Sequence, residues 1–310
     1  MKWFGRRRLS NHRLGLFLAP ARSTLCSVDL TGERPRVSQV LELATEDDGL
    51  PDAGALAEAV RALERPASPL HAVLGPGMYQ LLLVEAPDVD ADELRQAVRW
   101  RIKDLIDFHI DDAVIDVFAI PGQQNRPSGK AQMYTVAART GLIAELVKRV
   151  QQASLQLQVI DIAELALRNL GSLVDGEARG LVTLWLENEQ GLLIVSRQGE
   201  LFMTRHLNFG SDALAEGGSY SRDQVLLEIQ RSLDYYTSHF AQPMPAVLRV
   251  LPGFAGDEEL ARHLDQDLEP SCALLDSSSL IEIEPALEAN VYEQALLAIG
   301  GALRREELSL

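Results

Sequence analysis

The sequence contains few residues of the types that build disulfide bonds, metal sites or membrane spans. Two of its 310 residues are cysteines, Cys26 and Cys272, and because two cysteines alone cannot form a metal site, a reduced, cytosolic chain is the simplest interpretation. No apolar run approaches the roughly 18 to 20 residues that are needed to span a bilayer. The basic start is not followed by an apolar segment long enough for a signal peptide. We therefore expect a cytoplasmic protein, and a hydrophobic content of 46% with 24% charged residues is that of a globular chain.

Positive charge is scarce and unevenly distributed. The formal net charge is -16, which argues against non-specific binding to nucleic acid. Five positive charges nevertheless lie within the first 13 residues, where there is no acidic residue. A solvated chain end explains this segment, and so does a weak contact with anionic lipid, which Trp3 and Phe4 would assist.

Common signatures of catalysis are absent from the sequence. Its six histidines show no metal-ligand spacing, and it has neither a Gly-x-Ser-x-Gly elbow nor a Gly-x-x-x-x-Gly-Lys-Ser/Thr phosphate loop. The adjacent acids Asp47–Asp48 and Asp111–Asp112 are best interpreted as solvated surface charges, because neighbours in a loop or a strand do not face each other by default. We expect no catalytic residue and no metal ligand.

Both halves of the chain begin with three consecutive strand-like runs. These runs are 14–18, 24–30 and 36–43 in the first half and 180–187, 191–197 and 200–209 in the second. Helices and further strands then alternate. The expected helices are 52–64, 92–106, 140–153, 162–170, 221–239, 257–266 and 289–303, and the further strands are 71–75, 79–86, 132–138, 155–162 and 246–251. This order predicts an α/β fold in which an actin-type domain is duplicated and helices cover mixed sheets.

The most informative segment is 93–120, which predicts a helix, a short loop and a strand. Apolar residues recur at helical spacing from Leu94 to Ile106, and Trp100 lies among the charged residues of the opposite face. The period then changes from 3.6 to two over residues 114–119, as expected for a strand.

Two parts of this segment, Arg-Trp-Arg at 99–101 and Phe-His-Ile-Asp-Asp at 108–112, resemble PilM, the family of actin-like cytoplasmic proteins of type IV pilus assembly. The similarity extends from about residue 14 to residue 305. It implies a duplicated actin-like (ribonuclease H-like) fold with an accessory subdomain in the first half. The implied domains are a basic tail at 1–13, a first lobe at 14–171 with the accessory subdomain at about 78–139, and a second lobe at 172–310.

The resemblance also implies where a nucleotide would bind, and the residues there depart from the family pattern. An active actin-like ATPase needs glycines where backbone N–H groups meet phosphates and carboxylates to hold Mg²⁺. Phe17 stands where the first acid is expected, and Ala19 follows it; Thr183 and Trp185 occupy the acid and glycine positions of the second loop. The turn that would receive adenosine, residues 251–256, keeps Gly253 but has the bulky Phe254 beside it. We expect a degenerate site that binds no cofactor.

The remaining expectations from the resemblance concern partners. In the family, the cytoplasmic tail of the inner-membrane protein PilN lies in a groove between the first lobe and the accessory subdomain. Leu83, Trp100, Leu105 and Phe108 are our candidates for this groove, although ordinary core positions would explain them equally. The expected function is a non-catalytic scaffold, peripheral at the inner membrane, that binds a PilN-like tail and other platform proteins of pilus assembly. The alternatives are an active ATPase or sugar kinase, and a GspL-like component of type II secretion, which would normally continue into a membrane span.

Overall fold

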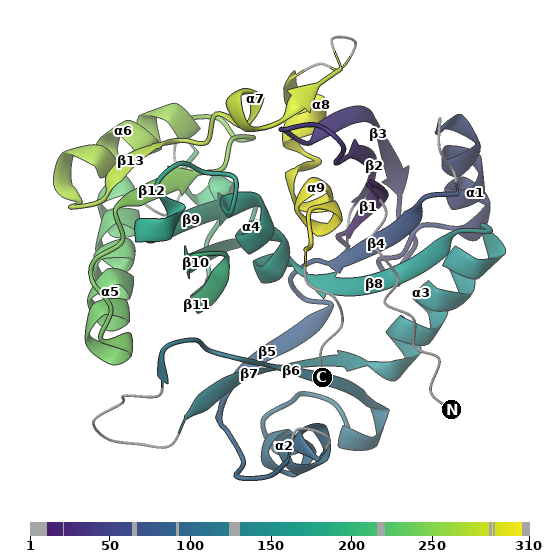
Figure 1. Ribbon diagram of the computed structural model, residues 1–310, viewed down its shortest axis with the longest axis horizontal. Helices are drawn as coiled ribbons and strands as arrows, with labels where there is room; N and C mark the ends of the chain where they lie inside the picture. The colour runs from purple at the N-terminus through teal and green to yellow at the C-terminus, as the bar shows by residue number, and fades with distance from the viewer. Residues whose placement is uncertain are drawn as a thin grey trace.

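The computed structural model describes residues 11–20, 22–63, 67–90, 93–123, 131–215, 221–284, 287 and 289–305. Two lobes lie side by side, and a smaller accessory subdomain lies against both of them (Figure 1). The basic residues 2–8 and the predicted lipid contacts Trp3 and Phe4 lie outside the described residues. Arg13, which we assigned to the basic tail, instead lies in the first strand, is buried, and donates a hydrogen bond of 2.8 Å to the carbonyl of Ala302.

The first lobe contains a six-stranded mixed sheet with the strand order β14-β3-β2-β1-β4-β8. Its strands are β1 (His12–Leu18), β2 (Arg22–Asp29), β3 (Arg36–Ala44), β4 (Pro69–Leu74), β8 (Gln156–Ile162) and the two-residue β14 (Glu282–Ile283). Its helices are α1 (Ala53–Ala62), α3 (Thr140–Gln152) and α4 (Ala163–Gly171). The strands β1, β2 and β4 are almost entirely buried, as expected for nearly continuous apolar runs between two layers.

The second lobe repeats this arrangement with the order β11-β10-β9-β12-β13. Its strands are β9 (Leu181–Leu186), β10 (Gly191–Arg197), β11 (Glu200–Leu207), β12 (Val247–Val250) and β13 (Ser271–Leu274). Its helices are α5 (Arg222–Phe240), α6 (Asp257–Asp267) and α7 (Ser277–Leu280), with short 3-10 turns at Glu177–Arg179 and Ser211–Ala213. After β14, the chain continues with α8 (Ala289–Glu293) and α9 (Leu296–Ala302), and α9 packs against β1, β2 and β4 of the first lobe. Apart from the added β14, both sheets have one topology, so the expected duplication is present.

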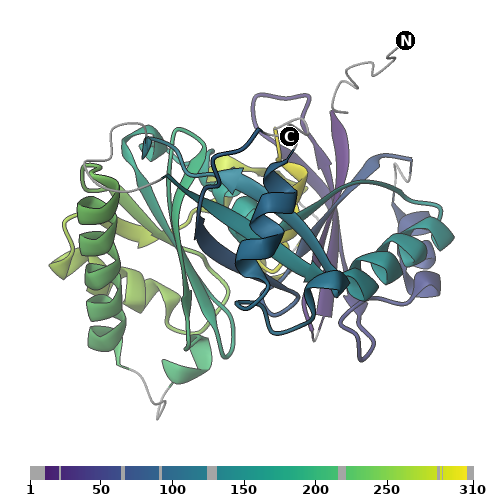
Figure 2. The ribbon, with the colours of Figure 1, turned by 90° about the horizontal axis from the view of Figure 1, so that it is seen from below.

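The accessory subdomain is inserted between β4 and α3. It contains β5 (Tyr79–Glu85), α2 (Leu94–Ile102), a 3-10 turn at Ile110–Asp112, β6 (Ala113–Ala119) and β7 (Gln132–Arg139). The strands form an antiparallel sheet in the order β5-β7-β6. The helix α2 packs on one face of this sheet through Val98 and Ile102, which are fully buried beside Val84, Val117 and Met133. Figure 2 shows this helix on the outside of the molecule.

The helices α4 and α9 lie between the two lobes and pack against each other (Figure 1). Glycines allow the close approach. A Cβ atom at Gly300 would lie 2.2 Å from the carbonyl oxygen of Ala166 on α4, and one at Gly15 would lie 1.9 Å from that of Ala298 on α9. Any side chain at either position would therefore push the helix out of the interface.

Two helices differ from those that the sequence predicts, and two short strands are additional to it. The helix expected at 92–106 ends at Ile102, and the one expected at 289–303 is divided into α8 and α9 at Ala295, because α9 must enter the buried space between the lobes. The strands β13 and β14 were not predicted, since both are too short to show a period. The polar loop expected at 121–130 is described only up to residue 123.

Candidate functional site

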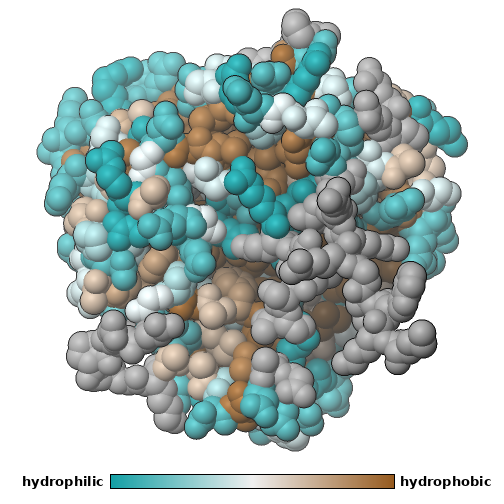
Figure 3. All heavy atoms as spheres, viewed as in Figure 1, coloured by the Kyte–Doolittle hydropathy of each residue, from teal (hydrophilic) through white to brown (hydrophobic). Residues whose placement is uncertain are grey.

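Two aromatic rings meet across the cleft between the lobes. Phe17 is the last residue but one of β1, and Trp185 holds the same position in β9, the equivalent strand of the second repeat. The ring centroids are 6.2 Å apart with an interplanar angle of 87°, and the two residues are only 5% and 9% exposed. This is the edge-to-face geometry that aromatic pairs favour. Figure 3 shows hydrophobic residues gathered in the hollow between the lobes.

The other residues that we predicted at the nucleotide site in the two hairpins, Ala19 and Thr183, supply neither a carboxylate for a metal ion nor an exposed N–H group for a phosphate. Thr183 is 3% exposed, and its hydroxyl has no hydrogen-bond partner among the described residues. Ala19 is buried and is followed by Pro20, which has no N–H group to offer to a phosphate. Phe17, Thr183 and Trp185 line none of the four most pronounced cavities on the described part of the chain, whose volumes are about 390 to 520 Å³.

In the turn expected to receive adenosine, the backbone is hydrogen-bonded to an acidic residue that follows it in the chain. Gly253 has φ +130° and open space around its Cβ position, so the backbone conformation requires the glycine. Its N–H group donates to a carboxylate oxygen of Asp257 at 3.1 Å. Asp257 and the next two residues, both glutamates, form the first turn of α6. These carboxylates already meet the partial positive charge of the helix N-terminus, which leaves it less attractive to a phosphate.

Two buried carboxylates near the cleft have protein partners. Asp161, at the end of β8, pairs with Arg304 at 2.8 Å. Glu164 on α4 is fully buried, accepts a hydrogen bond from the hydroxyl of Tyr79 on β5, and lies 3.0 Å from Nε2 of His206 on β11. Burial, and secondarily the charge of Glu164, raise the pKa of Tyr79 well above its usual value. Glu164 therefore joins the first lobe to the accessory subdomain and to the second lobe.

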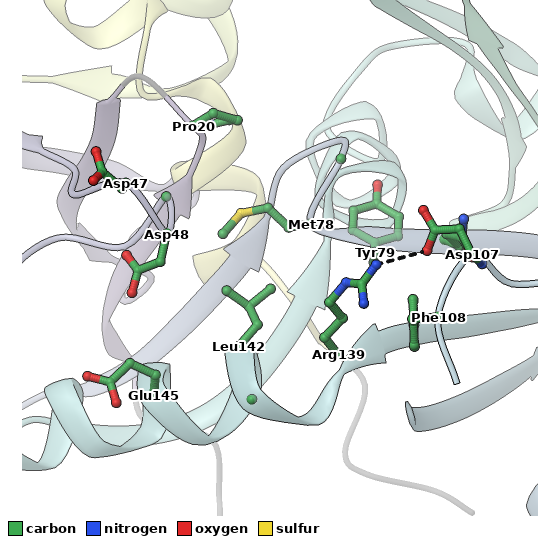
Figure 4. Close-up of a pocket in the computed structure, with 14 residues that line it drawn as sticks. Pro20, Asp47, Asp48, Met78, Tyr79, Asp107, Phe108, Arg139, Leu142 and Glu145 are labelled. Atoms are coloured by element: carbon green, nitrogen blue, oxygen red, sulfur yellow. Dashed lines mark hydrogen bonds and ion pairs between the residues drawn. The ribbon is translucent and has the colours of Figure 1, made fainter. Parts of the chain in front are cut away.

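An open groove lies between the first lobe and the accessory subdomain. Its volume is about 510 Å³. The first lobe contributes Pro20, the loop 47–49 and the start of α3, while the accessory subdomain contributes residues 77–80, 107 and 108 together with Arg139 at the end of β7. Figure 4 shows the side chains of Met78 and Leu142 between the charged groups of the two walls. The groove thus combines an apolar floor with polar edges, as ligand sites commonly do.

Ion pairs fix the positions of charged side chains on both sides of this groove. On the accessory side, Arg139 pairs with Asp107 at 3.3 Å and lies 4.5 Å from the centroid of the Phe108 ring. On the lobe side, the buried Arg149 binds carboxylate oxygens of Asp48 at 2.5 Å and Glu145 at 3.1 Å. Hydrogen bonds from Lys148 and then from Arg149 lower the pKa of Glu145.

The structure brings one of the four predicted groove residues, Phe108, into the groove. Leu83 is 38% exposed on the face of the accessory sheet that points away from α2, because its neighbours Leu82 and Val84 pack towards that helix. Trp100 is 70% exposed on the outer side of α2, and Leu105 is 58% exposed beyond its end. Three of the four are therefore surface residues and not core.

Sequence reasoning did not find Pro20, Met78 or Leu142. Each is an ordinary apolar residue at the end of an element, and only the packing of α3 and β4 against the accessory subdomain brings them together. Gly77 and Gly141 also line the groove and face open space, and these two glycines were the sequence feature that could have indicated its position. Two further absences hold for the described ranges: no group of three or more His, Cys, Asp or Glu is placed to hold a metal, and no helix is both long and apolar enough to cross a bilayer.

The two repeated sheets and the helices that cover them form an actin-like fold. Residues 79–217 match the family model of the type IV pilus assembly protein PilM. The matched segment contains the accessory subdomain, α4 and the first three strands of the second lobe. The similarity to PilM in sequence is therefore shown for this segment, which is a little less than half of the chain. No curated protein matched it in a comparison of sequences.

Solved structures share the fold over nearly the whole chain. A chain of the PilM-PilN type IV pilus biogenesis complex has a TM-score of 0.68 at 20% identity, with 96% of this chain and 98% of that one covered. The cytoplasmic domain of EpsL, an inner-membrane component of the type II secretion system of Vibrio cholerae, has a TM-score of 0.53 at 12% identity, with 95% and 96% covered. A Bacteroides thetaiotaomicron protein with an actin-like ATPase fold has a TM-score of 0.51 at 6% identity, with 94% and 96% covered.

Proposed function

We propose that this chain is a non-catalytic scaffold of type IV pilus assembly, which uses its groove to bind the cytoplasmic tail of a PilN-like inner-membrane protein. The observation that carries the proposal is the contrast between its two hollows. The cleft where an actin-like enzyme would hold its nucleotide is occupied by the rings of Phe17 and Trp185, whereas the groove beside the accessory subdomain is open.

The groove has the size and lining that suit a short segment of another chain. An extended peptide could place apolar side chains against Met78 and Leu142 and keep its polar groups at the charged rims. A tail that is anchored in the membrane would also keep this protein at the cytoplasmic face of the inner membrane. That location requires no membrane-spanning helix in the chain itself. Other proteins of the assembly platform would be recruited through the same complex.

The finer assignment is to the MshI proteins of MSHA pilus biogenesis. It rests on the Arg-Trp-Arg segment at 99–101 and the loop at 108–112, which carry the resemblance. The exposed ring of Trp100, on the outer side of α2, is then available to a second partner rather than to the groove.

Similarity to EpsL supports one competing function, a GspL-like component of type II secretion. The higher TM-score of the PilM chain and the match of residues 79–217 favour the pilus. An active ATPase is disfavoured because neither hairpin supplies a carboxylate at the expected positions. The identity of the captured membrane protein would separate the two assembly systems.

Recovery of the partner from detergent-solubilised membranes of the source organism tests the proposal. Gly141 lies in the first turn of α3, lines the groove, and has open space at its Cβ position. Gly141→Trp should therefore fill the groove without disturbing the fold. The matched control is Gln152→Trp, exposed at the other end of α3, about 16 Å away along the helix.

The wild-type chain and Gln152→Trp should retain the same inner-membrane protein, one with a short cytoplasmic tail before its membrane span, and Gly141→Trp should lose it. Equal recovery by the wild-type chain and both variants would contradict the groove assignment. Trp100→Ala, tested in parallel, measures the contribution of that ring separately.

A further inference from the structure

The groove is unevenly charged. Four carboxylates and one cation line it: Asp47, Asp48, Asp107, Glu145 and Arg139. The cation is already engaged by Asp107 on its own side of the groove. A ligand that enters the groove therefore meets mainly negative charge.

The neighbouring cations reduce this charge but do not remove it. Arg149 binds Glu46 as well as Asp48 and Glu145, and Lys148 binds Glu145. The whole cluster contains five carboxylates and three cations, which leaves two negative charges in excess. Asp47 is exposed at the rim, and the structure gives it no hydrogen bond or ion pair within the described ranges.

Apolar side chains lie beside these acids. Met78 and Leu142 form the floor, with Pro20 at one end and Phe108 at the other (Figure 4). A long basic side chain is suited to such a surface, because its methylene stem can cover apolar atoms while its charged head reaches a carboxylate. A ligand with acidic side chains would meet repulsion at the lobe wall, where the excess negative charge lies.

Resting on the function proposed above, we propose that the groove selects membrane-protein tails in which Lys or Arg adjoins apolar residues, with a basic side chain placed at Asp47. Charge complementarity supports this occupant independently of the pilus assignment. Cytoplasmic segments next to a membrane span carry an excess of Lys and Arg, and the groove offers the opposite charge. Such complementarity mainly confers selectivity between competing tails and sensitivity to salt.

An array of synthetic tails tests the selection. The array carries the cytoplasmic tails of the single-span inner-membrane proteins of the source organism, each printed also with every Lys and Arg replaced by Gln. It is probed with the wild-type chain, the filled-groove variant Gly141→Trp, and Asp47→Lys. Asp267→Lys, with the same charge change at the exposed end of α6 in the second lobe, is the control.

We expect the wild-type chain to retain a small set of tails that contain Lys or Arg, and Gly141→Trp to lose them. The Gln versions should bind about three-fold more weakly or worse, as expected when exposed charge pairs are removed. Asp47→Lys should weaken binding about five-fold or more, because repulsion replaces attraction, while Asp267→Lys should leave it unchanged. Added salt should reduce the difference between the two versions.

The outcomes separate the inference from the function on which it rests. Groove-dependent binding that is unaffected by the Gln replacement, or by Asp47→Lys, would overturn the charge selection and leave the docking function standing. If no tail is retained, or if Gly141→Trp retains the same tails as the wild-type chain, both proposals fail together.

Discussion

The contact between Phe17 and Trp185 should contribute to stability as a pair, because it joins the two lobes. The perturbation is a double-mutant cycle with Phe17→Leu, Trp185→Leu and both together. Both rings are almost fully buried. Each single change should therefore cost about 1 to 3 kcal/mol in the free energy of unfolding, less than the 3 to 5 kcal/mol that is typical for truncation to alanine.

The informative quantity is the coupling energy of the cycle. An edge-to-face pair at a centroid distance of 6.2 Å should give a coupling of about 0.5 to 1.5 kcal/mol beyond the loss of buried area. Urea unfolding followed by circular dichroism measures it without relying on the fluorescence of the tryptophan that is replaced. Phe202 and Tyr236, which have nearly the same geometry inside the second lobe, provide the positive control.

A coupling near zero for Phe17 and Trp185, with a clear coupling in the control pair, would refute the idea that the rings join the lobes. The inference that aromatic rings occupy the space of a nucleotide would fail with it.

Three further predictions concern buried polar groups. Tyr79→Phe removes a hydrogen-bond donor from the buried carboxylate of Glu164, so it should lower the free energy of unfolding by about 1 to 3 kcal/mol. Urea unfolding measures this change, and an unchanged value would contradict a role for this hydrogen bond in joining the accessory subdomain to the first lobe. Arg304→Met leaves Asp161 buried without its cation, which should lower the free energy of unfolding by about 3 to 5 kcal/mol. Adding the neutralising change Asp161→Asn should restore part of this loss. Purely additive effects of the two changes would argue against an ion pair between these residues. Burial raises the pKa of Cys26 to about 12 from an ordinary value of 9.0, so the unfolded thiol ionises first, and stability should be retained below about pH 9 and lost as the pH rises towards 12. Urea titrations at several alkaline pH values check this trend, and a Cys26→Ala variant should lose part of the pH dependence.

Much of the fold was predictable because its signals are local. The strands of both lobes are apolar runs bounded by turn residues, and their repeated order indicated the duplication before any contact was known. The missed strand β13 has four residues with alternating exposure, which is too short for a period to emerge. The break before α9 falls at Ala295, where no helix-breaking residue marks it.

The site was less predictable because it depends on packing. From the resemblance we expected Phe17 and Trp185 to stand at positions where an active enzyme has an acid and a glycine, but only the arrangement of the two lobes brings their rings together. In the accessory subdomain, we predicted that Trp100 and Leu105 line the groove, and the structure places both on the surface outside it. The outer position of Trp100 follows from the packing of α2 on its sheet through Val98. Helical spacing alone does not show on which side of the subdomain the groove lies.

The central claim is that the cleft between the lobes no longer holds a nucleotide with its metal. Measurement of the melting temperature with millimolar Mg-ATP, against Mg²⁺ alone and ATP alone, tests it most directly. A ligand present at about 100 times its dissociation constant adds roughly 2.7 kcal/mol to the stability of the state that binds it. We predict an unchanged melting temperature in all three solutions, and a rise of several degrees that requires both Mg²⁺ and ATP would contradict the account.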